Sequence, residues 1–88
     1  MGRLLYVGFD IFRMLPSVED LSLLIGLLLG KPRVSPQDRL VEDLGAESAD
    51  LVNLAATVEE KYHVELAEAE VARVHTVADL HALIARHA

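Results

Sequence analysis

Residues 43–50 read Asp-Leu-Gly-Ala-Glu-Ser-Ala-Asp, and they mark the point where a glycine loop ends and a helix begins. Apolar side chains then recur at helical spacing, at Leu51, Leu54, Ala55, Val58 and Tyr62. The pattern predicts a helix over residues 48–62 with one apolar face and with Ser48 at its N-terminal end. A serine in this place is either a helix cap or a chemical handle displayed by a packed helix.

Considered without its wider sequence context, Ser48 is more often a helix cap than a functional residue. Serine is a preferred N-cap residue, because its oxygen accepts a backbone N–H that has no partner inside the helix. The acids Glu47 and Asp50 on either side suit the positive end of the helix dipole.

The longer stretch of sequence around Ser48 favours a functional role for this residue. Residues 39–54, Arg-Leu-Val-Glu-Asp-Leu-Gly-Ala-Glu-Ser-Ala-Asp-Leu-Val-Asn-Leu, followed by Val-Glu-Glu-Lys-Tyr at 58–62, resemble the acyl carrier proteins. The resemblance covers residues 17–88. It implies that Ser48 carries a covalent 4′-phosphopantetheine arm, which holds acyl intermediates as thioesters for fatty-acid, lipid or polyketide synthesis. It implies no catalytic residue, so the chain is not expected to be an enzyme.

The sequence departs from the family pattern at Glu47, where aspartate is usual, and at Ala49, where leucine is usual. Asn53 replaces a usual glutamate, and Ala56 replaces a usual larger apolar residue. We expect the first change to affect the rate of arm attachment and the others to affect the choice of partner enzymes.

Acidic residues are dense on the second and third predicted helices. They are ordinarily a solvated face, but the resemblance implies docking to a phosphopantetheinyl transferase and to acyl synthases and acyltransferases with basic patches. The expected docking residues are Glu47, Asp50, Val52, Ala56, Glu59 and Glu60. Ala49, Ala55 and Ala56 thin the second helix, which predicts extra room between the second and third helices for a long or bulky acyl chain or for a specialised partner.

Composition excludes several other classes of protein. The 88 residues suit one small domain, and a net charge of −6 argues against nucleic acid as a partner. There is no cysteine, and the four histidines show no HExxH pattern and no i, i+4 pair, so we expect no metal site and place the histidines at the surface. No apolar run is long enough to span a membrane. We expect a monomer in the cytoplasm.

The expected fold is an all-α, four-helix, acyl-carrier-like bundle over residues 17–88, with an apolar N-terminal extension over residues 1–16. Capping patterns begin helices at Ser17 and Thr76, which predicts helices over 18–29 and from residue 76, and the short third helix is expected near 68–73. A long loop over 31–46 joins the first two helices and is expected to place Leu40 and Leu44 in the core.

The helix predicted over residues 18–29 has almost no polar face, and such a helix is normally buried all round. The apolar residues 1–15 or a second copy of the protein are the candidates to cover it.

Two alternatives stay open at this level. One is a peptidyl or aminoacyl carrier on the same fold. The other is a carrier-like interaction module that lacks the arm and binds partners through its helices.

Overall fold

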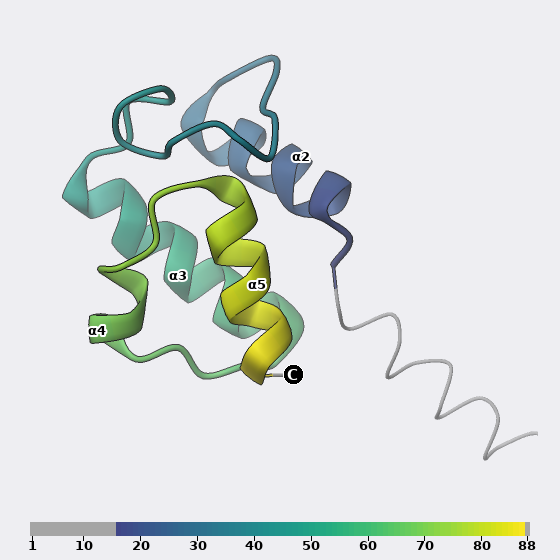
Figure 1. Ribbon diagram of the computed structural model, residues 1–88, viewed down its shortest axis with the longest axis vertical. Helices are drawn as coiled ribbons and strands as arrows, with labels where there is room; N and C mark the ends of the chain where they lie inside the picture. Colours follow the sequence, from purple (N-terminus) through teal and green to yellow (C-terminus); the bar gives the residue numbers. More distant parts are fainter. Residues whose placement is uncertain (1–15, 88) are drawn as a thin grey trace, which may run out of the picture.

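A computed structural model describes residues 16–87 of the chain. It contains four helices: α2 (Val18–Leu29), α3 (Ser48–Tyr62), the short α4 (Glu68–Val71) and α5 (Val77–His87) (Figure 1). The described residues form no strand, and their single β-bridge joins Arg39 to Thr76. The all-α, four-helix prediction is therefore confirmed, with a third helix shorter than expected.

The bounds of α2 follow from residues at its two ends. The Ser17 hydroxyl accepts the Asp20 N–H at 3.0 Å, and the Asp20 carboxylate accepts the Ser17 N–H in return, as predicted. Gly30 ends the helix with a φ of 68°, a left-handed conformation that glycine adopts without steric cost. Gly26 lies so close to the following loop that an added Cβ would meet the Lys31 carbonyl oxygen at 2.8 Å.

The core lies between α2, α3, α5 and the long loop, and α2 contacts both α5 and α3. Its members are aliphatic apart from one tyrosine: Leu21, Ile25, Leu40, Leu44, Ala46, Leu54, Val58, Tyr62, Val64, Val77, Leu80 and Ile84. The loop thus contributes Leu40 and Leu44 as predicted, while the expected inner-face residues Leu51 and Ala55 of α3 are only half-buried.

The expectation that α2 is buried all round is not met within the described residues. Leu23 is 68% exposed, Leu27 82% and Leu28 42%, whereas Leu21 and Ile25 are fully buried. The remaining helices reach only one side of α2. The suggested cover, residues 1–15, lies outside the described residues, so the division into an extension of 1–16 and a domain of 17–88 stays a prediction.

The histidines correct one detail of the sequence analysis. His63, His75 and His87 are exposed as expected, but His81 is half-buried, and its Nε2 donates to the carbonyl oxygen of the buried Pro16 at 2.9 Å. No group of potential metal ligands gathers within residues 16–87. In that same part of the chain, no helix has both the length and the apolar character to cross a membrane.

Candidate functional site

The turn before α3 is built around Gly45. Its φ is +70°, and its N–H donates to the Val41 carbonyl at 3.0 Å. The neighbours Leu44 and Ala46 are both 5% exposed, so the turn is held from either side by burial. An added Cβ at Gly45 would meet nothing within 4 Å, so the surface beside the turn is open.

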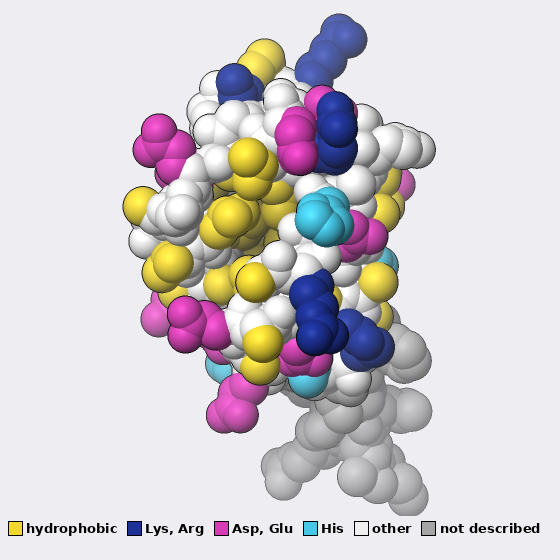
Figure 2. Space-filling model, turned by 60° about the vertical axis from the view of Figure 1, so that its left-hand side comes forward, with side chains coloured by type: hydrophobic (Ala, Val, Ile, Leu, Met, Phe, Trp, Pro, Cys, Tyr) yellow, Lys and Arg dark blue, Asp and Glu magenta, His cyan; other side chains and the backbone are white. Residues whose placement is uncertain are grey.

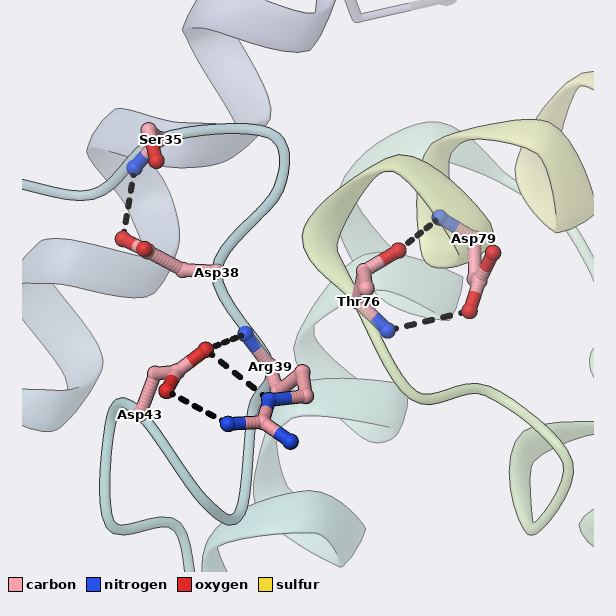
Figure 3. Close-up of polar contacts among 6 residues, drawn as sticks. All are labelled: Ser35, Asp38, Arg39, Asp43, Thr76 and Asp79. Atoms are coloured by element: carbon pink, nitrogen blue, oxygen red, sulfur yellow. Dashed lines mark hydrogen bonds and ion pairs between the residues drawn. The ribbon is translucent and has the colours of Figure 1, made fainter.

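A charged clip closes the same turn (Figure 3). The Asp43 carboxylate accepts the Arg39 backbone N–H at 2.8 Å and pairs with the Arg39 guanidinium through Nε and Nη2, both at 3.2 Å. These hydrogen bonds lower the pKa of the Asp43 carboxyl. An exposed pair of this kind contributes little stability by itself, but its bidentate geometry fixes the direction in which the loop turns.

The loop is also fastened to the start of α5. The Leu40 N–H donates to the His75 carbonyl at 2.8 Å, and the Val77 N–H donates to the Asp38 carbonyl at 3.1 Å. The Thr76 hydroxyl accepts the Asp79 N–H, and the Asp79 carboxylate accepts the N–H of Thr76, which confirms the predicted capping pattern (Figure 3). The segment that leads to Ser48 is therefore held by a helix far away in the sequence.

Ser48 is not the cap of α3, which corrects the cap interpretation. The N-cap residue is Glu47, in an extended conformation with φ −97° and ψ 171°, and its N–H donates to Asp50 Oδ2 at 2.9 Å. Asp50, three residues after the cap, thus satisfies the backbone at the helix start. Ser48 is the first residue of α3, is exposed, and keeps its hydroxyl outside the capping arrangement.

The position of Ser48 suits a covalently attached phosphate. The first N–H groups of a helix have no partner inside the helix and favour a negative group close to them. An exposed hydroxyl at this point, beside the open surface of Gly45, can be reached by another protein and can hold a phosphodiester. The residues present therefore fit a phosphopantetheine arm on Ser48.

The expected docking residues fall into two groups in the structure. Glu47, Glu60, Val52 and Ala56 are not buried, and Val52 is 67% exposed. Asp50 is half-buried and serves the helix start, and half-buried Glu59 accepts the Leu66 N–H at 2.9 Å through Oε2.

Figure 2 turns forward the side of the molecule on which α3 begins and α4 lies, and it shows a hollowed apolar area with acids at its left-hand margin. A cavity between α3, α4 and α5 has a volume of only about 10 Å³. Its lining residues are Leu40, Leu51, Leu54, Ala55, Val71, Val74 and Leu80. A void of this size is at the limit for one water molecule. The described residues therefore do not show the predicted extra room for cargo in this conformation.

Sequence reasoning missed the contacts between distant segments. No local sequence pattern indicates three of these contacts. They are the Glu59–Leu66 hydrogen bond, the His81–Pro16 hydrogen bond and the hydrogen bond between His87 Nε2 and the Glu70 carboxylate at 3.0 Å. The Arg39–Asp43 pair has i, i+4 spacing, but in a loop this spacing gives no reason to expect contact.

The family described as "Phosphopantetheine attachment site" matches residues 19–84. Among curated relatives, the chain is 41% identical over 51 residues to the acyl carrier protein of Helicobacter hepaticus, over 58% of this chain and 67% of that protein. The corresponding protein of Wolinella succinogenes is 40% identical over 53% of this chain and 62% of its own length. That of Helicobacter pylori is 33% identical over 70% of this chain and 82% of its own length.

A solved structure from Mycobacterium tuberculosis, provisionally described as an acyl carrier protein, has the same fold. It superposes with a TM-score of 0.74 at 24% sequence identity, over 78% of this chain and 95% of its own.

Proposed function

Because the chain belongs to the family of proteins with a phosphopantetheine attachment site, we propose that Ser48 is the residue that receives the 4′-phosphopantetheine arm. One observation carries the proposal: Ser48 is exposed at the first position of α3, while Glu47 and Asp50 perform the capping. The hydroxyl is therefore available for chemistry, and its loss would leave the helix start intact.

Attachment is a phosphoryl transfer from coenzyme A. The Ser48 oxygen forms a bond to the phosphorus that carries pantetheine, the P–O bond of the pyrophosphate breaks, and the adenosine bisphosphate leaves. The hydroxyl proton passes to a base of a separate, Mg²⁺-dependent transferase. The product is a phosphodiester, which the dipole of α3 favours by about 0.3–1 kcal/mol.

The protein acts as an acyl carrier protein, as its family and its curated relatives support. The arm supplies a terminal thiol that holds an acyl group as a thioester. The carrier moves the acyl group between enzymes of fatty-acid, lipid or polyketide synthesis and performs no chemistry of its own.

Docking uses the exposed surface around Ser48. Glu47 and Glu60 offer negative charge to Lys and Arg of the transferase, synthases and acyltransferases, and Val52 and Ala56 offer an apolar strip beside that charge. Asp50 and Glu59 contribute charge to the same surface while they hold backbone N–H groups. Their removal would disturb structure and docking together.

Intact mass of protein purified after coexpression with a transferase tests the acyl role. We expect species with the arm alone and species with an added acyl group, and neutral hydroxylamine should remove the acyl group because it cleaves thioesters. The mass of the added group separates acyl from aminoacyl or peptidyl cargo. A chain that never acquires the arm would instead support the interaction-module alternative.

A further inference from the structure

The structure has a second surface feature, whose lining residues do not include Ser48. A groove of about 1020 Å³ runs between α2 and the loop that follows it. Its lining belongs entirely to residues 19–38: Glu19, Ser22, Leu23, Gly26, Leu27, Lys31, Pro32, Arg33, Val34, Ser35, Pro36 and Asp38. None of these residues belongs to the loop end at Ser48 or to α3.

The walls of this groove are apolar where solvent reaches them. Leu23 and Leu27 stand one helical turn apart on α2 and are 68% and 82% exposed. Val34 packs against the core from the loop, and Pro32 and Pro36 extend the apolar lining. Exposed apolar surface of this kind, rimmed by charged groups, usually marks an interaction site.

Pro16, the first residue that the structure describes, lies near one end of the groove. Pro16 is buried, and its carbonyl accepts His81 Nε2 at 2.9 Å. Ala78, one turn earlier on α5, donates its N–H to the carbonyl of Pro36 at 2.9 Å, and Pro36 lines the groove. Residues 1–15 therefore join the body beside the groove end that carries Glu19 and Asp38.

We propose that residues 1–15 of the same chain occupy this groove and cover Leu23 and Leu27. The segment is rich in large apolar side chains, at Leu4, Leu5, Tyr6, Val7, Phe9, Ile11, Phe12, Met14 and Leu15. It supplies the apolar partner that α2 lacks within the described residues. The proposal is independent of the carrier function, since the groove does not involve Ser48.

The segment is long enough to line the whole groove. The 12 residues of α2 span about 18 Å at the helical rise, and fifteen residues span about 22 Å as a helix or about 50 Å when extended. The attachment at Pro16 also keeps the segment at a high effective concentration beside the groove.

The charges of the segment match those of the groove. Arg13 is three residues before Pro16, which would bring it near Glu19 and Asp38, the acids at that end. The segment also carries Asp10, and the groove lining offers Lys31 and Arg33 as cations for it. A second copy of the chain is less favoured as the occupant, because each copy has a net charge of −6 and the two would repel.

A spin label on the segment tests the proposal in the full-length chain. The natural sequence has no cysteine, so Gly8→Cys offers a single thiol, and the added Ser48→Ala change prevents any arm thiol from reacting. We expect the label to broaden the amide NMR signals of Leu27 and Val34 more strongly than those of α3. The broadening should not weaken when the labelled protein is diluted with unlabelled chains.

The variant Leu27→Glu tests whether the broadening depends on the apolar groove. Val52→Glu is its matched control, at an exposed position outside the groove. Leu27→Glu should abolish most of the broadening at Val34, and Val52→Glu should preserve it. The proposal is overturned if Leu27 and Val34 stay sharp in the labelled parent protein. It is also overturned if broadening occurs only between separate molecules, in mixtures of labelled and isotope-enriched chains, because the occupant is then a second copy.

Discussion

The Glu47 N–H donates to Asp50 Oδ2 at 2.9 Å, and this hydrogen bond starts α3 one residue before Ser48. An acid three residues beyond the cap thus holds the backbone N–H of the cap residue, and Ser48 takes no part in this hydrogen bond. Ser48 is left exposed with its hydroxyl free for modification. The sequence pattern offers Ser48 both for helix initiation and for the arm attachment that we propose, and this hydrogen bond assigns helix initiation to other residues.

Asp50→Ala should destabilise the domain, because the Glu47 N–H at the helix start loses its acceptor. We expect the free energy of unfolding to fall by about 0.5–2 kcal/mol, the usual cost of losing a capping hydrogen bond. Urea denaturation measures it, with Glu60→Ala, an exposed acid on the same helix, as the control. If Ser48→Ala proved as destabilising as Asp50→Ala, the division of tasks would be wrong.

Asp79 should give the domain an acid-sensitive contribution to stability. Hydrogen bonds from the Thr76 and His75 N–H groups lower the pKa of its carboxyl below the ordinary value of 3.8. Since the folded pKa is the lower one, the contribution is fully present above pH 3.8 and is lost as pH falls through the folded pKa.

The comparison of wild type with Asp79→Asn measures this contribution. The difference in unfolding free energy should be constant near neutral pH and should shrink as the solution is acidified below about pH 4. If the difference in unfolding free energy stays the same down to the lowest pH at which the protein is folded, the charge of Asp79 does not contribute to stability.

His63→Gly should stabilise the protein. His63 ends α3 in the left-handed conformation, with φ 56° and ψ 47°, where a side chain is strained and glycine is not. We expect a gain of about 0.5–1 kcal/mol, the relief of strain less the extra freedom of glycine in the unfolded chain. Thermal unfolding reports the change, and a lower midpoint for the glycine variant would contradict the assigned backbone conformation.

Glu60→Lys should weaken binding to the transferase. Glu60 is exposed on α3, and its reversal should raise Kd by about two- to fivefold, as expected for a contact worth about 0.5–1 kcal/mol. Glu59 is unsuited to this test because it accepts the Leu66 N–H. The matched control is Glu19→Lys on α2.

Affinity of the wild type for the transferase should fall as salt is raised, because exposed charges are screened beyond about 8–10 Å. Binding that ignores both salt and Glu60→Lys would argue against an acidic docking surface.

The helix bounds could be predicted because their signals are local. Helix ends are marked at Ser17, Gly30 and Thr76 by the side-chain or backbone chemistry of each residue. The spacing of apolar residues along α3 indicates which face of that helix turns inwards. The role of Glu47 could not be predicted, because glutamate is not a usual cap residue and the acceptor belongs to Asp50. The fastening of the loop to His75 and Val77 depends on pairs far apart in sequence, for which a single chain offers no pattern.

The most direct test of the central claim is the intact mass of three chains, each coexpressed with a broad phosphopantetheinyl transferase. The chains are the wild type, Ser48→Ala, and Ser35→Ala as a control at another exposed serine. We predict that the wild type and Ser35→Ala gain one phosphopantetheine each, and that Ser48→Ala stays folded and gains none. A wild type left unmodified by several transferases, or a Ser48→Ala chain that still acquires the arm, would contradict the assignment of Ser48 as the attachment site.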